Sequence, residues 1–153
     1  MNVFFDTDFT LVGSNAQLRP GVRECFQKLT EDGHKVYVWS GVRAPWEIAN
    51  YFRLGEFISG IFLKPLSNHH DELIFLGIPV TPDFCVDDNT SIIDVFGGYQ
   101  IPPYVFTEVP DDHMWRVYEA VKQFAVSLDG LQTQPVPQED APASPTAAEQ
   151  PAP

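Results

Sequence analysis

The feature that most constrains the fold is a regular alternation of short apolar runs with segments of helical spacing. Runs of strand length recur at residues 3–5, 36–39, 61–63, 84–86 and 104–106. Between and after them, apolar residues recur at helical spacing over residues 22–29 and 114–125. Strands that are apolar throughout and alternate with helices are typical of a parallel sheet covered on both faces. The predicted fold class is therefore α/β, a doubly wound, Rossmann-like sheet.

The carboxyl-terminal segment differs in composition from the rest of the chain. The 153 residues suffice for one domain of this kind. From Gly130 onward the chain holds six of its fourteen prolines, and no large apolar residue follows Val136. Such a segment cannot bury enough apolar surface to offset the entropy lost on ordering. We therefore predict an α/β domain over residues 1–129 and a disordered, acidic, Pro/Ala/Gln-rich tail over residues 130–153.

Charge and hydropathy restrict the partners and the location. The chain carries 21 acidic and 9 basic residues, a formal net charge of −12, so duplex nucleic acid is an unsuitable partner. The start of the chain lacks the basic flank and long apolar stretch of a targeting signal, and nowhere do 18 apolar residues run together. We expect no membrane partner and a cytoplasmic location. The two cysteines, Cys25 and Cys85, are expected to be buried core thiols.

Polar side chains follow four of the predicted strands at the point where each strand ends. They are Asp6 and Asp8, then Ser40, then Lys64, then Asp87 and Asp88. Right-handed crossovers bring the carboxyl ends of parallel strands to one edge of the sheet, where ligands bind. Carboxylates are preferred ligands of Mg²⁺, and a lysine ammonium binds phosphate oxygens. The sequence therefore predicts a site that holds a divalent cation together with a phosphoryl group.

The order of these residues resembles the four motifs of the haloacid dehalogenase-like superfamily over residues 2–98. The matching segments are Asp6-Thr7-Asp8-Phe9-Thr10-Leu11, Ser40-Gly41, Lys64-Pro65 and Val86-Asp87-Asp88. A second aspartate at Asp8 is typical of the phosphatase and phosphomutase members of that superfamily. The resemblance implies a phosphatase-type hydrolase that cleaves phosphomonoesters and depends on Mg²⁺.

The resemblance also implies a role for each acidic residue. Asp6 would attack phosphorus and form an aspartyl-phosphate, and Asp8 would protonate the leaving oxygen and then activate water. The Mg²⁺ ion would be held by the Asp6 carboxylate, the backbone carbonyl of Asp8 and the pair Asp87 and Asp88, with Asp88 as the preferred direct ligand.

The remaining motif residues would bind the phosphoryl oxygens: Ser40, the N–H of Gly41, and Lys64. Two positions depart from the superfamily pattern. Phe9 stands where a small residue is more common, and no acidic residue follows Asp88 at three or four positions. These departures favour an alternative function, a catalytically weak binding or regulatory domain with the same fold.

The segments between the motifs bear on the substrate. Residues 12–35 and 41–60 each leave room for little more than one helix, so no sizeable cap domain is expected. An open sheet edge admits either a small phosphorylated molecule or an exposed phosphate on a macromolecule, and a second copy of the chain is an alternative cover. His69 and His70 are expected to be exposed residues at a helix start rather than metal ligands. Arg43 lies close enough to Ser40 in sequence to contact a substrate anion.

Overall fold

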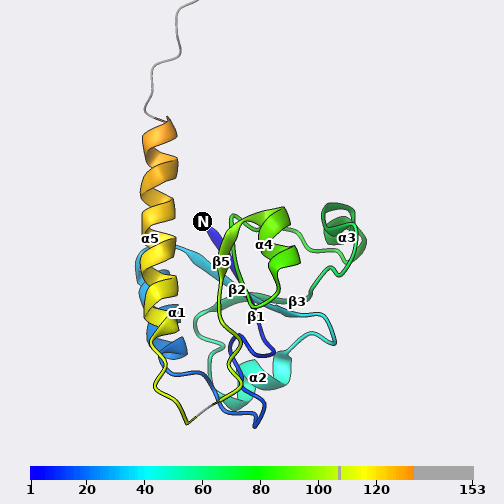
Figure 1. Ribbon diagram of the computed structural model, residues 1–153. Coiled ribbons are helices and arrows are strands. Elements are labelled where there is room, and N and C mark those ends of the chain that lie inside the picture. The colour runs from blue at the N-terminus through cyan, green and yellow to red at the C-terminus, as the bar shows by residue number, and fades with distance from the viewer. Residues whose placement is uncertain (107, 133–153) are drawn as a thin grey trace, which may run out of the picture.

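A computed structural model describes residues 1–106 and 108–132, with side chains described up to residue 128. Figure 1 shows one sheet with helices on both sides. Its strands are parallel, lie in the order β3-β2-β1-β4-β5, and comprise β1 (Asn2–Asp6), β2 (Lys35–Ser40), β3 (Ile58–Leu63), β4 (Phe84–Asp87) and β5 (Gly98–Gln100). The helices are α1 (Val22–Glu31), α2 (Trp46–Tyr51), α3 (His69–Phe75), α4 (Thr90–Phe96) and α5 (His113–Gln132). The predicted doubly wound α/β fold is confirmed, and no cap interrupts it in the described part of the chain.

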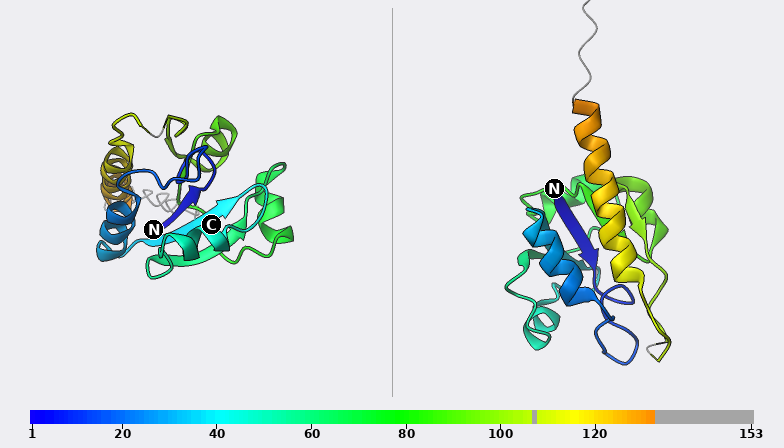
Figure 2. Two further views of the ribbon diagram at one scale, coloured as in Figure 1. Left: turned by 90° about the horizontal axis from the view of Figure 1, so that it is seen from below. Right: turned by 90° about the vertical axis from the view of Figure 1, so that its left-hand side faces the viewer.

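Central strand β1 explains why the strands read as continuous apolar runs. Successive side chains of a strand point to opposite faces. Val3 and Phe5 belong to the core beneath α1 and α5, which lie side by side in Figure 2, whereas Phe4 belongs to the core beneath α3 and α4. On that second face Phe4 stacks on Tyr37 and contacts Trp39, with ring centroids 4.7 Å apart in both pairs. Both faces of β1 are therefore covered.

The two predicted amphipathic helices are confirmed. Helix α1 buries Val22, Cys25, Phe26 and Leu29, and α5 buries Met114, Val117, Tyr118 and Val121. Helix α5 continues to Gln132, three residues beyond Asp129, the predicted last residue of the domain. The rest of the predicted tail lies outside the described residues. Among the described helices, none combines the length and hydropathy needed to cross a bilayer.

The predicted fifth strand at residues 104–106 is wrong. The fifth strand is β5, where Gly98 pairs with Cys85 at the edge of the sheet. Gly98 has φ +132, and a Cβ there would overlap the Cys85 backbone, so only glycine fits. Two prolines at 102 and 103 then remove backbone donors, and the chain leaves the sheet. The run includes Tyr104 because that side chain is buried in the core without being part of a strand. The Tyr104 N–H donates to the Phe9 carbonyl at 2.7 Å.

Candidate functional site

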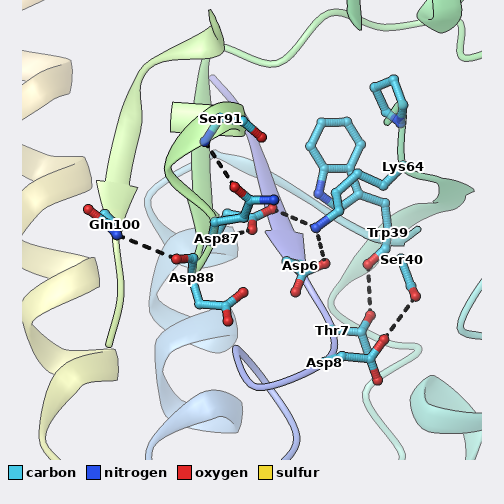
Figure 3. Close-up of polar contacts among 12 residues, drawn as sticks. Asp6, Thr7, Asp8, Trp39, Ser40, Lys64, Asp87, Asp88, Ser91 and Gln100 are labelled. Atoms are coloured by element: carbon cyan, nitrogen blue, oxygen red, sulfur yellow. Dashed lines mark hydrogen bonds and ion pairs between the residues drawn. The ribbon is translucent and has the colours of Figure 1, made fainter. Parts of the chain in front are cut away.

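The predicted site residues meet at the carboxyl edge of the sheet, as Figure 3 shows. A hollow of ≈ 560 Å³ lies there, lined by Asp6, Asp8, Phe9, Gly41, Val42, Lys64, Leu66, Asp88 and Asn89. The two predicted residues outside this lining, Ser40 and Asp87, bond directly to Asp8 and Lys64. The strand order places β2 and β4 on either side of β1, so residues from distant parts of the chain gather around Asp6.

Lys64 forms the centre of a buried ion cluster. Its Nζ lies 2.7 Å from Asp6 Oδ1 and 3.0 Å from Asp87 Oδ2 (Figure 3). The side chains of Lys64, Asp6 and Asp87 are 9%, 4% and 0% exposed. Asp87 also accepts the N–H of Asn89 through its other oxygen at 2.9 Å. One ammonium therefore neutralises two carboxylates only in part.

Burial and mutual repulsion shift the protonation of this cluster. Burial first, and the neighbouring Asp87 charge second, raise the pKa of Asp6 to about 7 against the partial compensation of Lys64. Burial also raises the pKa of Asp87. Burial alone would lower the pKa of Lys64, but the two carboxylates outweigh it and raise that pKa. The cluster thus lacks positive charge, the condition under which an additional cation is bound.

The three carboxylates of Asp6, Asp87 and Asp88 have the chemistry of a cation site. Each offers one oxygen, and the three oxygens lie within 4.8 Å of one another. Oxygen donors of this kind suit Mg²⁺, so the donor set fits the predicted ion. The Asp8 carboxylate is outside this group and accepts a hydrogen bond from Ser40 instead.

Asp8 differs from Asp6 in its surroundings, although only Thr7 separates them. Asp8 is exposed, and its Oδ2 accepts the Ser40 hydroxyl at 3.0 Å. The Thr7 hydroxyl donates to the Trp39 carbonyl at 2.8 Å, which ties the end of β1 to β2. One aspartate of the pair is therefore a buried, ion-paired group, and the other is in contact with solvent.

The loop after Asp8 is a tight turn with a strained residue. The Thr7 carbonyl accepts the N–H groups of Leu11 and Val12 at 2.9 and 3.0 Å, and the Phe9 N–H donates to the Val12 carbonyl at 2.8 Å. Phe9 itself has φ 58, in the left-handed region. This conformation costs a residue other than glycine about 1–2 kcal/mol. Phe9, which departs from the superfamily pattern in the sequence, thus also has a strained backbone conformation beside the site.

Two contacts that support the site were not predicted from the sequence. Glu72 accepts the N–H groups of Leu66 and Ser67 at 2.6 and 3.2 Å and so holds the loop that follows Lys64. Asn89 caps α4 by accepting the Ser91 N–H at 3.0 Å, which commits its side-chain oxygen. The cap has a sequence signal, since asparagine before a helix is favoured, whereas the Glu72 contact has none.

The two histidines stand at a helix start, as predicted, but only His70 is exposed, whereas His69 is half-buried. His69 and His70 begin α3, and both rings pack against Phe96, at centroid distances of 6.1 and 5.1 Å. His69 Nδ1 lies 3.2 Å from the Pro65 carbonyl oxygen. Their surroundings are those of packing residues.

Fold and site together define a class of protein: a small Rossmann-like α/β protein with a buried three-aspartate cluster at the carboxyl edge of its sheet. A scan against protein-family models and a search of curated proteins found no match to this chain.

Proposed function

We propose that this chain is a Mg²⁺-dependent phosphomonoester hydrolase that acts through an aspartyl-phosphate on Asp6, as a capless member of the haloacid dehalogenase-like superfamily. The observation that supports it best is the convergence of Asp6, Lys64, Asp87 and Asp88 at the carboxyl edge of the sheet, where all of them except Asp87 line one hollow. Single aspartates after strands are commonly turn or cap residues. A lysine paired with two buried aspartates, with a third carboxylate nearby, has no such simple structural role.

The two aspartates of the first motif suit different chemical steps. Asp6 forms a bond to phosphorus as the bond from phosphorus to the leaving oxygen breaks, and Asp8 donates a proton to that oxygen. Water then attacks the phosphorus of the aspartyl-phosphate while Asp8 accepts its proton, which releases phosphate and regenerates the Asp6 carboxylate. The exposed position of Asp8 suits proton exchange with solvent, and the Ser40 hydroxyl orients its carboxylate.

Phosphoryl binding is assigned to Lys64, Ser40 and the N–H of Gly41. Lys64 and Gly41 line the hollow. The Ser40 hydroxyl donates to Asp8, which is itself part of the lining. Mg²⁺ would be held by Asp6, the backbone carbonyl of Asp8, Asp87 and Asp88, and would supply the positive charge that offsets repulsion between these carboxylates and a phosphate dianion. The rigid buried pairing of Lys64 places its ammonium beside Asp6 before any substrate arrives.

The decisive experiment compares Asp6→Asn with Asp8→Asn on an aryl phosphate that has a good leaving group. Asp6→Asn removes the attacking oxygen, so turnover falls to background and no phosphoenzyme forms. Asp8→Asn keeps the nucleophile but loses a proton-transfer step worth about 10²- to 10⁴-fold. Mass spectrometry should therefore detect a phosphate adduct on Asp8→Asn and none on Asp6→Asn. The exposed helix residue Asp94, changed to Asn, is the matched control and keeps wild-type turnover.

The same experiment tests the alternative of a catalytically weak binding or regulatory domain, which the strained Phe9 favours. Wild-type protein that releases no phosphate from any phosphomonoester with Mg²⁺ present would support the alternative. Substantial turnover by Asp6→Asn would instead contradict the nucleophile and the superfamily assignment together.

A further inference from the structure

A second hollow adjoins the first at Asp8. It has a volume of ≈ 330 Å³ and is lined by Thr7, Asp8, Ser40, Val42, Arg43, Pro45, Glu47 and Ile48. Of these, Asp8 and Val42 also line the first hollow. If the phosphoryl group occupies the first hollow, the leaving oxygen has to lie beside its proton donor, Asp8. The group attached to that oxygen then extends into the second hollow.

We propose that the second hollow binds the leaving group and that the substrate is a phosphomonoester with a compact apolar leaving group, such as an aryl or arylmethyl group. This inference rests on the proposed function and adds the substrate class to it. The polar side chains of the lining already have partners within the protein, and the walls between them are apolar.

The hydroxyl groups of the second hollow are already used. The Thr7 hydroxyl donates to the Trp39 carbonyl at 2.8 Å, and the Ser40 hydroxyl donates to Asp8 at 3.0 Å. A sugar or another polyol bound here would have to compete with these bonds to use either hydroxyl as a partner. Burying unpaired hydroxyls costs about 1–3 kcal/mol each, which disfavours a polyol leaving group.

Besides Asp8, the lining contains two charged residues, Arg43 and Glu47, which neutralise each other. Arg43 Nη2 lies 2.8 Å from Glu47 Oε2, one turn later in sequence, and both side chains are 72% exposed. The pair contributes no net charge, so it attracts neither an anionic nor a cationic leaving group strongly. The expectation that Arg43 contacts a substrate anion is thereby weakened, because an anion would also approach Glu47.

What remains of the lining is apolar. Pro45 is buried and Ile48 is half-buried against the core, so both form a wall that exists before a ligand binds. Val42 is 83% exposed at the junction of the two hollows. An apolar group that covers Val42 and the accessible part of Ile48 removes apolar surface from water, which favours binding.

The test uses two phosphomonoesters that both release alkoxides, benzyl phosphate and glycerol 2-phosphate, so that the chemical leaving ability is similar. With Mg²⁺, wild-type protein should show kcat/KM at least about tenfold higher for benzyl phosphate. Val42→Asn keeps the backbone but makes the wall polar, and should lower this preference by about threefold or more. Val126→Asn, at a 72% exposed position on α5, is the matched control and keeps the wild-type preference.

Binding without turnover provides a second readout. Calorimetry with Mg²⁺ should show benzylphosphonate binding wild-type protein more tightly than methylphosphonate, and Val42→Asn should reduce the difference. The source of the aryl group is separated by comparing a small phosphotyrosine derivative with a phosphotyrosyl peptide, since both release the same phenol. A higher kcat/KM for the peptide would identify a macromolecular substrate, and equal values would identify a small one. Either result agrees with an aryl leaving group in the second hollow.

The outcomes separate the two proposals. A preference for glycerol 2-phosphate, or a benzyl preference unchanged in Val42→Asn, overturns the leaving-group inference and leaves phosphatase activity standing. Absence of phosphate release from every ester overturns the proposed function and this inference with it.

Discussion

Replacement of Arg19 by methionine should be among the most destabilising substitutions in this protein. Its guanidinium is 1% exposed and pairs with Asp111, 10% exposed, at 2.9 Å. It also donates to the carbonyls of Thr10 and Pro102 at 3.1 and 2.7 Å and lies over the Tyr104 ring at 5.2 Å. One side chain thus joins the loop after β1, the segment after β5 and the start of α5.

The expected cost follows from this burial. Methionine fills similar volume but leaves the Asp111 carboxylate and two buried carbonyls without their donor. Breaking a buried ion pair on one side costs about 3–5 kcal/mol. For a protein of this size that lowers the melting temperature by about 10 °C or more. The exposed pair Arg116–Asp112, with side chains 58% and 65% exposed, offers a matched comparison whose loss costs about 0.2–1 kcal/mol.

Urea denaturation of Arg19→Met and Arg116→Met measures both values in the same chain. The double variant Arg19→Met/Asp111→Asn should recover part of the loss, because it removes the unpaired charge while its amide oxygen can still accept the His113 N–H, as Asp111 Oδ1 does at 2.9 Å. If Arg19→Met costs no more than Arg116→Met, the buried cluster does not hold these three segments together and the reasoning fails.

Three further predictions concern the site. Without metal, the free energy of unfolding should fall as pH rises from about 4 to about 7. Burial and Asp87 raise the pKa of Asp6 to about 7, so the folded state binds a proton more tightly than the unfolded state. Urea denaturation should show a shallower dependence of stability on pH in Asp6→Asn, and an equal dependence in both proteins would contradict the raised pKa of Asp6. Mg²⁺ at 100-fold excess over Kd should stabilise the folded wild type by about 2.7 kcal/mol and so raise its melting temperature. The rise should be smaller in Asp88→Asn, and an equal rise in both proteins would exclude Asp88 as a ligand. Phe9→Gly should change stability by less than about 1 kcal/mol, since relief of φ 58 offsets lost contacts, whereas Phe9→Val should destabilise clearly because β-branching opposes a positive φ; thermal melts that rank the two variants the other way would refute this.

The sequence was sufficient to predict the elements that bury apolar residues on both faces. Apolar strands that alternate with helices form a parallel sheet, and right-handed crossovers then bring Asp6, Ser40, Lys64 and Asp87 to one edge of it. Strand β5 was not predicted, because its sequence Gly-Tyr-Gln lies at the edge of the sheet and contains no apolar run. A strand was wrongly predicted around the buried Tyr104, whose N–H donates to the Phe9 carbonyl and not to a neighbouring strand.

Side-chain pairing within the site was beyond the sequence for a different reason. Strand order brings residues to a common edge, but it does not say which charge contacts which. That Lys64 would bridge Asp6 and Asp87, and that Asp8 would pair with Ser40, depends on loop geometry and rotamers. Arg19 likewise gave no signal, because one arginine before a proline looks like any surface residue.

The Lys64 bridge has a consequence for the life of the protein before it meets an ion. Many small metal sites built from acidic residues gain their folded state only when the ion arrives, because the ligands repel one another in its absence. Here a permanent internal cation, carried by the chain itself, holds Asp6 and Asp87 together from the moment β1, β3 and β4 assemble. The pairing of Asp6 and Asp87 with Lys64 thus needs no bound ion to hold these strands together.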